Sequence, residues 1–227
     1  MDESGKNPVD YLGDDEDIFD IRCRPSKPSD AEQVAFLISS LLDNVFADAF
    51  GPGGQKSQDI LANALKNRLR HDCMWVMTEG ETIIGVIDLE SVETRRLNGH
   101  PLTRSLVAGL EINEKIESAG LLPILMHESA PDEAHQAIAS ILPGSRGEGR
   151  GTLLLMHAAF WSRAQGKSWM TTWLPEDNAF RPVYDRRGYF EERRVATNLA
   201  GEKIAWSFLK RPISASAYKI LRKKEKE

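Results

Sequence analysis

The chain has 227 residues, of which 41% are hydrophobic and 28% are charged, so a collagen-like, coiled-coil or wholly disordered chain is excluded. Its 34 acidic residues outnumber its 29 basic ones, and a net charge of −5 argues against nucleic-acid binding through overall charge. No apolar run approaches the roughly 18 residues that a membrane span needs, so neither nucleic acid nor a membrane is an expected partner.

The two ends of the chain carry opposite charges. Residues 1–20 hold eight acidic residues against Lys6 and lack the apolar core of a secretory signal, so a cytoplasmic protein is expected. Residues 210–227 hold seven basic residues against two acidic ones. We therefore expect an acidic arm over 1–17, one domain over 18–210 and a basic, solvated tail over 211–227.

The chain has only two cysteines, Cys23 and Cys73, which lie far apart in the sequence. Two are too few for a disulfide framework, and no further Cys or His stands at the spacing of a zinc site. We expect both to be reduced core residues, and we expect no metal site.

The first half of the domain predicts a strand, two amphipathic helices and a hairpin. Ser29-Asp30-Ala31-Glu32 has the form of a capping box that opens the first helix, and Glu79-Gly80-Glu81 joins the two strands of the hairpin. In chain order these elements are expected at 18–24, from 29 onward, and at 57–70, 74–78 and 82–90.

Residues 91–133 are too many for a simple connection, so an insertion is expected there. Within it, 102–119 shows partial helical periodicity and 121–126 suggests a short strand. The following elements are a strand, a helix, a strand, a helix and two strands, expected at 135–142, 153–165, 167–174, 179–187, 189–195 and 203–210. This order predicts an α/β protein with a mixed sheet and helices on its faces.

A glycine-rich loop stands between the strand at 135–142 and the helix that follows. It runs from Gly144 to Gly151 and contains four glycines. Glycines let backbone N–H groups approach an anion closely, and the N-terminus of a helix adds positive potential. The loop therefore predicts a phosphate or pyrophosphate ligand.

Neither of the common nucleotide loops fits this segment. A Walker A loop needs Lys and Ser or Thr where the chain has Arg150 and Gly151, so the ammonium and the Mg²⁺-binding hydroxyl are missing. The dinucleotide pattern G-x-G-x-x-G fails from Gly147, where it reaches Thr152, and from Gly149, where it reaches Leu154.

The pattern that fits is R-x-x-G-x-G, formed by Arg146, Gly149 and Gly151. A second element follows with the form N-x-x-x-x-x-Y-x-x-x-G-[FY], and its fixed positions are Asn178, Tyr184, Gly188 and Tyr189. Together they resemble the acyl-coenzyme A signature of the GNAT acyltransferase superfamily, over about residues 135–195.

The resemblance implies a central mixed sheet of about seven strands, helices on both faces and a splayed pair of parallel strands at 135–142 and 167–174. Acyl-CoA would lie between those strands. The implied enzyme is an N-acetyltransferase that moves acetyl from CoA directly to a primary amine in a ternary complex. The resemblance does not decide whether the amine belongs to a small molecule or to a protein. It also leaves open whether the chain forms a homodimer. The alternative is a non-catalytic acyl-CoA sensor or scaffold.

The same resemblance implies the cofactor-binding residues. Backbone amides of the loop would hold the pyrophosphate, the strand before it would pair with the pantetheine, and an Asn would bond the pantetheine or cap a helix. These residues are Ile141, Leu142, Arg146, Gly147, Glu148, Gly149, Arg150, Gly151, Thr152 and Asn178.

Tyr184 is the implied general acid, because a phenol can supply the proton that helps the thiol of CoA to leave. Glu90 and His135 are the two candidates for the general base, and the sequence does not choose between them. Arg181 and Pro182 depart from the family pattern, so the direction in which the Tyr184 side chain points is left open. Trp173 is either a core residue or part of the acceptor pocket.

Overall fold

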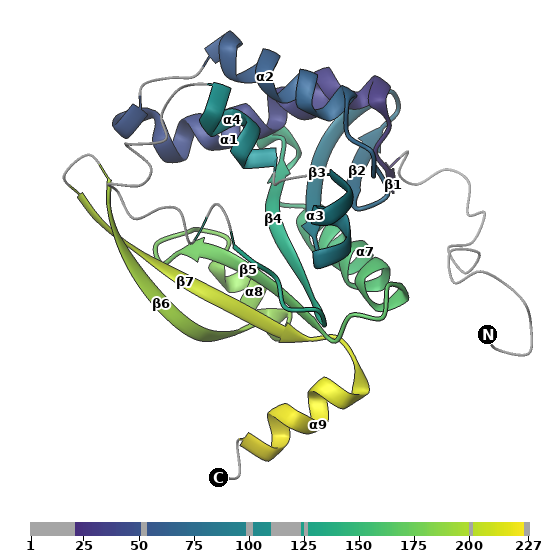
Figure 1. Ribbon diagram of the computed structural model, residues 1–227, viewed down its shortest axis with the longest axis vertical. Helices are drawn as coiled ribbons and strands as arrows, with labels where there is room; N and C mark the ends of the chain where they lie inside the picture. Colours follow the sequence, from purple (N-terminus) through teal and green to yellow (C-terminus); the bar gives the residue numbers. More distant parts are fainter. Residues whose placement is uncertain are drawn as a thin grey trace, which may run out of the picture.

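The computed structural model describes residues 21–50, 54–98, 102–109, 124, 127–199 and 202–224. Its seven strands form one mixed sheet in the order β1-β2-β3-β4-β5-β7-β6 (Figure 1). The strands are β1 Ile21–Pro25, β2 Met74–Glu79, β3 Thr82–Glu90, β4 Glu133–Ile141, β5 Trp169–Pro175, β6 Phe190–Leu199 and β7 Glu202–Pro212. The predicted α/β class with a seven-stranded mixed sheet is confirmed.

Helices pack on both faces of the sheet, as predicted. The α-helices are α1 Ala31–Phe50, α2 Gly54–Lys66, α3 Val92–Asn98, α4 Leu102–Gly109, α7 Arg150–Ala164, α8 Arg181–Arg186 and α9 Ala215–Lys224. One core cluster joins α1 and α2 to β2, β3 and β4, and includes Ile38, Leu61 and Val86. The other joins α7 and α8 to the opposite face, and includes Leu154, Met170 and Tyr184. The apolar stripes of these helices therefore bury both sides of the sheet.

The first helix begins differently from the prediction. A short 3-10 turn, η2 Pro28–Asp30, precedes α1, and the Asp30 carboxylate accepts a hydrogen bond of 2.8 Å from the Lys27 amide. Asp30 also forms an ion pair of 2.7 Å with Arg24 on β1. The capping box expected at Ser29 is thus displaced, because Asp30 serves the preceding turn and ties it to the sheet.

The only parallel pair among the described strands, β4 and β5, is joined over a short stretch. The register runs from Glu133 opposite Trp169 to Gln136 opposite Thr172, and pairing ends there. Beyond this point β4 continues beside β3 and β5 continues beside β7, so the two strands diverge (Figure 1). The splay predicted for 135–142 and 167–174 is confirmed.

A β-bulge explains where the strands separate. Opposite β4, Asp88 pairs with Ile138 and Leu89 pairs with Gln136, so Ala137 is an extra residue on β4. A bulge bends the strand that carries it and increases its local twist. Because Ala137 directly follows the last residue paired with β5, the bend turns β4 away from β5 at that position.

The insertion is described only in part. The structure places α3 and α4 in it, and α3 was not predicted. Most of the short strand suggested for 121–126 and the second half of the helix suggested for 102–119 lie outside the described residues, as does the acidic arm at 1–17. Ile124 is described, and it is helical.

The start of the basic tail is structured, although several of its described side chains are exposed as expected. Strand β7 extends to Pro212, and Ile213 and Ala217 are buried before and within α9. Both cysteines are free thiols, with Cys73 buried and Cys23 half-buried, as predicted. Burial raises the pKa of each thiol to about 11. Within the described ranges no helix has the length and hydropathy needed to cross a bilayer.

A buried ion pair ties the segment after α2 to the sheet. The Arg68 guanidinium donates two hydrogen bonds, of 2.7 and 3.1 Å, to the Asp88 carboxylate, and the Asp88 side chain has no exposed surface. Nearby, Arg70 pairs with Asp72, but the Asp72 carboxylate is 44% exposed. Only the first pair leaves a buried charge uncompensated if its acid is removed.

We expect Asp88→Asn to lower the free energy of unfolding by about 3–5 kcal/mol, because Arg68 would stay charged and buried without its partner. Asp72→Asn is the matched control and should cost at most about 1 kcal/mol, since its pair is exposed. Urea denaturation of both variants measures the difference. Equal costs for the two variants would contradict the assigned role of Asp88.

Candidate active site

The point where β4 leaves β5 brings together side chains from both strands and from α8. The Thr172 hydroxyl donates a hydrogen bond of 3.0 Å to the Gln136 carbonyl and so closes the last pair. The Gln136 side-chain amide donates a short hydrogen bond to the Tyr184 hydroxyl. Tyr184 thus lies at the apex of the splay.

Tyr184 reaches this position although Pro182 stands in the helix that carries it. Helix α8 begins at Arg181, so Pro182 occupies the first turn, where no backbone N–H is needed. The Tyr184 ring is buried and packs edge-on against Tyr189, with ring centroids 5.1 Å apart. Burial raises the pKa of the phenol, which keeps it protonated at neutral pH.

The glycine loop forms an open cradle at the N-terminus of α7. Gly147 and Gly149 have left-handed backbone φ values of +96° and +77°. A Cβ atom added at Gly144, Gly147 or Gly149 would meet no atom within 4 Å, so the loop backbone borders open space. The first intrahelical bond runs from the Leu153 amide to the Gly149 carbonyl, which leaves the preceding amides of the helix without an intrahelical acceptor.

The implied pairing of Leu142 with the pantetheine does not fit the backbone hydrogen bonds of β4. The Leu142 amide already donates a hydrogen bond of 2.8 Å to the Ile84 carbonyl on β3, so Leu142 faces away from the splay. Because strand residues alternate, Ile141 and Ala139 present their backbone groups to the side of β5. The Ile141 carbonyl accepts a hydrogen bond of 3.1 Å from Arg146 Nε.

Two arginines of the loop are held by neighbours. The Arg146 guanidinium lies 5.4 Å from the centroid of the Phe180 ring, across the mouth of the splay. Arg150 is mostly buried and forms ion pairs of 3.1 Å with Glu79 and 2.9 Å with Glu148. A phosphate near either arginine would therefore compete with contacts that already exist.

Thr152 lies in the first turn of α7 and is half-buried. The Asn178 side-chain oxygen accepts a hydrogen bond of 2.9 Å from the Phe180 amide. Asn178 thus holds the turn before α8, whose N-cap residue is Phe180 and which has no side-chain cap; its expected role toward the pantetheine stays a prediction.

Glu90 and His135, the two candidates for the base, lie opposite each other on β3 and β4. Both are buried. Burial, followed by the charge of Asp88, raises the pKa of Glu90 to about 7, although Arg95 forms an ion pair of 2.7 Å with it. Burial lowers the pKa of His135, and its Nδ1 lies 3.0 Å from the Thr171 hydroxyl. Glu90 is therefore the candidate that can exchange a proton near neutral pH.

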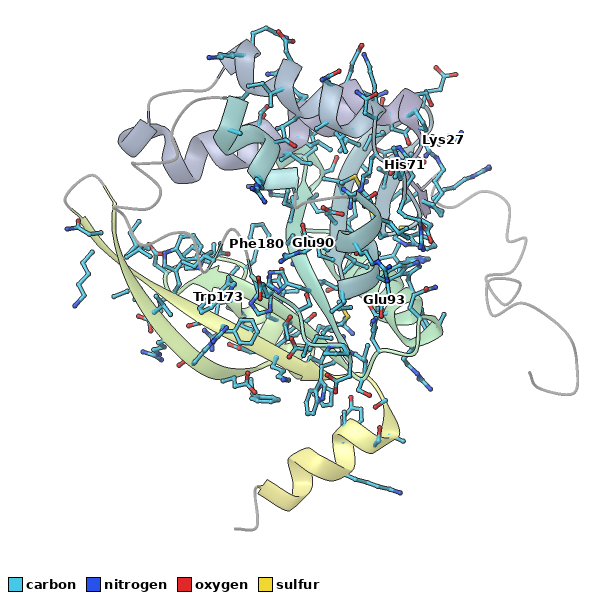
Figure 2. All side chains as sticks on the ribbon, viewed as in Figure 1. Lys27, His71, Glu90, Glu93, Trp173 and Phe180 are labelled. Carbon is cyan, nitrogen blue, oxygen red and sulfur yellow. The ribbon has the colours of Figure 1, made fainter. Side chains whose placement is uncertain are left out.

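The acid and the base candidates lie on opposite faces of the sheet. His135 and Gln136 are consecutive on β4, so their side chains point to opposite faces. Gln136 contacts Tyr184, whereas His135 shares its face with Glu90. Figure 2 shows Glu90, Phe180 and Trp173 near the middle of the molecule, where the strands separate.

Several residues around His135 carry no sequence signal. The His127 ring centroid lies 4.2 Å from that of His135 and 4.8 Å from that of Phe208. Burial opposes ionisation of Glu133, yet His127, Lys210 and the Ala130 amide lower its pKa to about 2. No motif carries these residues, since they meet only through the register of β4, β5 and β7.

The polar groups of the site donate and accept hydrogen bonds at the apex of the splay. In the described part of the chain, no three His, Cys, Asp or Glu side chains gather in a way that could hold a metal ion. The open cradle and the splay fit a phosphate-bearing ligand with an extended arm. Two buried polar atoms without a partner among the described residues, Gln136 Oε1 and Trp173 Nε1, belong to residues at the splay.

Solved structures of acetyltransferases share this architecture. A structure described as an acetyltransferase is 18% identical, covers 85% of this chain and 100% of its own, and has a TM-score of 0.60. An acetyltransferase of the GNAT family from Streptococcus pneumoniae is 16% identical, covers 86% and 99%, and scores 0.58. The candidate acetyltransferase yncA from Salmonella typhimurium, solved with its cofactor acetyl-CoA, is 12% identical, covers 86% and 95%, and scores 0.58.

These similarities show that the chain has the GNAT fold, as its two motifs implied. No protein-family model matches the sequence, and no curated protein sequence matches it. At sequence identities below 20%, similarity to solved structures shows the fold alone. The chemistry of this chain follows from its own residues.

The cradle yields a prediction that does not depend on activity. We expect Gly149→Ala to lower the free energy of unfolding by about 1–2 kcal/mol, because a left-handed backbone at φ +77° disfavours a Cβ atom even where space is free. Gly144→Ala is the control: its backbone is not left-handed, so stability should be unchanged or higher by up to about 1 kcal/mol. Thermal unfolding compares the two, and a reversed order would refute the strained geometry of the loop.

Proposed function

We propose that this protein is an acetyl-CoA-dependent N-acetyltransferase that transfers acetyl directly to a primary amine in a ternary complex. The observation that carries the proposal is the splay of β4 and β5, with the open glycine cradle at one end and the Tyr184 hydroxyl at the apex. Acetyl-CoA would supply a thioester-activated acetyl group there. The structural similarity to acetyltransferases supports the same class of reaction.

The proposed binding residues are those of the cradle and the exposed edge of β4. The free amides at the start of α7 would hold the pyrophosphate, since they combine unpaired N–H groups with the positive end of the helix. Backbone groups of Ile141 and Ala139 would pair with the pantetheine as an added strand. Arg146 would have to release the Ile141 carbonyl for this pairing, so its side chain is expected to move when the ligand binds.

Tyr184 would be the general acid. Its hydroxyl oxygen accepts a hydrogen bond from the Gln136 amide, which leaves the phenolic proton free to be donated elsewhere. Its raised pKa keeps that proton on the phenol until negative charge develops on the departing sulfur. Gln136 is thus a positioning residue, because it orients the hydroxyl without reaching the reacting atoms.

Glu90 would be the general base, directly or through a water molecule. It lies on the face of the sheet opposite Tyr184, and its pKa of about 7 makes it both available as a carboxylate and basic enough to accept a proton. The buried His135, whose pKa is lowered, would support the site by packing and by its contact with Thr171.

We expect Tyr184→Phe to lower kcat about 10²–10⁴-fold while acetyl-CoA affinity stays unchanged, because only proton donation is lost. Release of free CoA thiol measures turnover, and the rise in melting temperature with acetyl-CoA measures binding. Tyr189→Phe is the matched control, since it removes another buried hydroxyl from the same ring pair. Full activity of Tyr184→Phe would disprove its role. Binding without turnover in wild-type protein, over a broad set of amines, would favour the non-catalytic acyl-CoA sensor.

The assignment of Glu90 gives a pH dependence. Only the carboxylate form of a base is active, so a raised pKa means that kcat/KM falls as pH drops through about 7. We expect Glu90→Gln to be slower by about 10²-fold or more and to lose this fall. Initial rates between pH 5.5 and 9 at saturating acetyl-CoA measure both effects. A fall that persists in Glu90→Gln would assign the titration to another group.

A further inference from the structure

An arginine and two aromatic rings form a row on the face of the sheet that carries Glu90. Arg193 pairs with Phe208 between β6 and β7, and Phe208 pairs with Trp173 between β7 and β5. Residues directly opposite each other in antiparallel strands share a face. We call Arg193, Phe208 and Trp173 the Arg193 cluster.

The contacts within the Arg193 cluster are close. The guanidinium carbon of Arg193 lies 4.6 Å from the centroid of Phe208 and 5.1 Å from that of Trp173. The two ring centroids are 4.9 Å apart. Arg193 itself is exposed, whereas both rings are more than nine-tenths buried. The cluster therefore presents a cation to solvent on an aromatic floor.

This floor lies beside the proposed reaction centre. The Phe208 ring is stacked at 6.4 Å from His135, which is opposite Glu90. Trp173 directly follows Thr172, the last residue of β5 that pairs with β4. An acceptor that approaches the apex of the splay from the face of Glu90 therefore meets the Arg193 cluster.

The surrounding charges are paired, but Arg193 is not. Glu133 forms an ion pair of 2.8 Å with Lys210, and Glu90 is paired with Arg95. Among the described residues, no carboxylate lies within ion-pair distance of Arg193. The indole Nε1 of Trp173 is also buried without an acceptor in that part of the chain.

Arginine and tryptophan side chains can only donate hydrogen bonds. Two donors without an acceptor, next to each other and beside the reaction centre, fit an oxyanion of the substrate. A second positive charge on the acceptor would be repelled by a guanidinium that already covers both rings. The local charge therefore favours an anionic group on the amine over a second cation.

We infer that the acceptor is a small amine that carries a carboxylate, with the chemistry of an amino acid, and that Arg193 holds this carboxylate. The amine then faces Glu90, and the Trp173 indole supplies the floor and a second donor. This inference rests on the proposed N-acetyltransferase function, whose acceptor it specifies. Arg193 would be a specificity-determining residue rather than a catalytic one.

The test compares amino acids with their amides, such as leucine with leucinamide and methionine with methioninamide, at equal concentrations of free amine. Each pair differs only in the carboxylate. We expect wild-type kcat/KM to be about 10- to 100-fold higher for the acids, the range of a charge-assisted hydrogen bond. Arg193→Gln should remove this preference by raising KM for the acids about 10- to 100-fold more than KM for the amides.

Arg194→Gln is the matched control. Arg194 is the next residue of β6 and is also exposed, but it is paired with Glu176 and Glu191. Its substitution should leave the preference for acids intact. Each variant is first checked for the rise in melting temperature with acetyl-CoA, which reports a folded protein with a working cradle.

The results separate the two levels of the argument. If wild-type protein shows no thermal shift with acetyl-CoA, the proposed function fails and this inference fails with it. If it binds acetyl-CoA and acetylates amides or diamines as well as the acids, only this inference is overturned. The same holds if Arg193→Gln keeps the full preference for acids, or if only protein amines are acetylated.

Discussion

The structure depends on one interruption of hydrogen bonding, the loss of pairing between β4 and β5 after Gln136 and Thr172. Backbone groups at the middle of a sheet normally pair with the next strand, because unpaired and buried N–H and C=O groups are costly. Here β4 stays paired with β3 and β5 stays paired with β7, but β4 and β5 no longer pair with each other. The freed edges are thus available to a ligand that can hydrogen-bond like a strand, and the bulge at Ala137 fixes where they begin.

Buried charge is arranged around this opening in compensated pairs. Asp88 is matched by Arg68, Glu90 by Arg95 and Glu133 by Lys210. Two of these acids nevertheless differ in pKa. Burial and the charge of Asp88 raise the pKa of Glu90, whereas three hydrogen-bond donors outweigh burial and lower the pKa of Glu133. Carboxylates a few residues apart on one sheet thereby acquire different chemical roles, because the number of hydrogen-bond donors differs between them.

The sequence predicts those features that are encoded locally. The hairpin strand Thr82–Glu90 begins and ends where its pattern indicates, and the spacing of Arg146, Gly149 and Gly151 locates the cradle at the start of α7. The predicted helix that carries Tyr184 also forms, since Pro182 fits the first turn of α8. These features depend on residues near one another in the chain.

Features that depend on register between distant strands were not predictable. Nothing in the sequence around Ala137 marks a bulge, because the extra residue exists only relative to Asp88 and Leu89 on β3. The wrong choice of Leu142 for the pantetheine has the same origin: which of two neighbours faces the splay is decided by the bond from Leu142 to Ile84. The Arg193 cluster likewise arises from three strands and leaves no motif.

The two faces of the sheet give the proposed reaction its direction. Acyl transfer needs an amine that arrives on one side of the acyl carbon and a thiol that leaves on another. Because Gln136 and His135 are consecutive on β4, a donor oriented by Gln136 and an acceptor beside His135 lie on opposite faces without any special loop. In the proposed reaction Tyr184 would protonate the thiolate that leaves, and Glu90 would deprotonate the amine that arrives. The alternation of a single strand, exposed by a single bulge, would keep the two proton transfers on separate faces of the sheet.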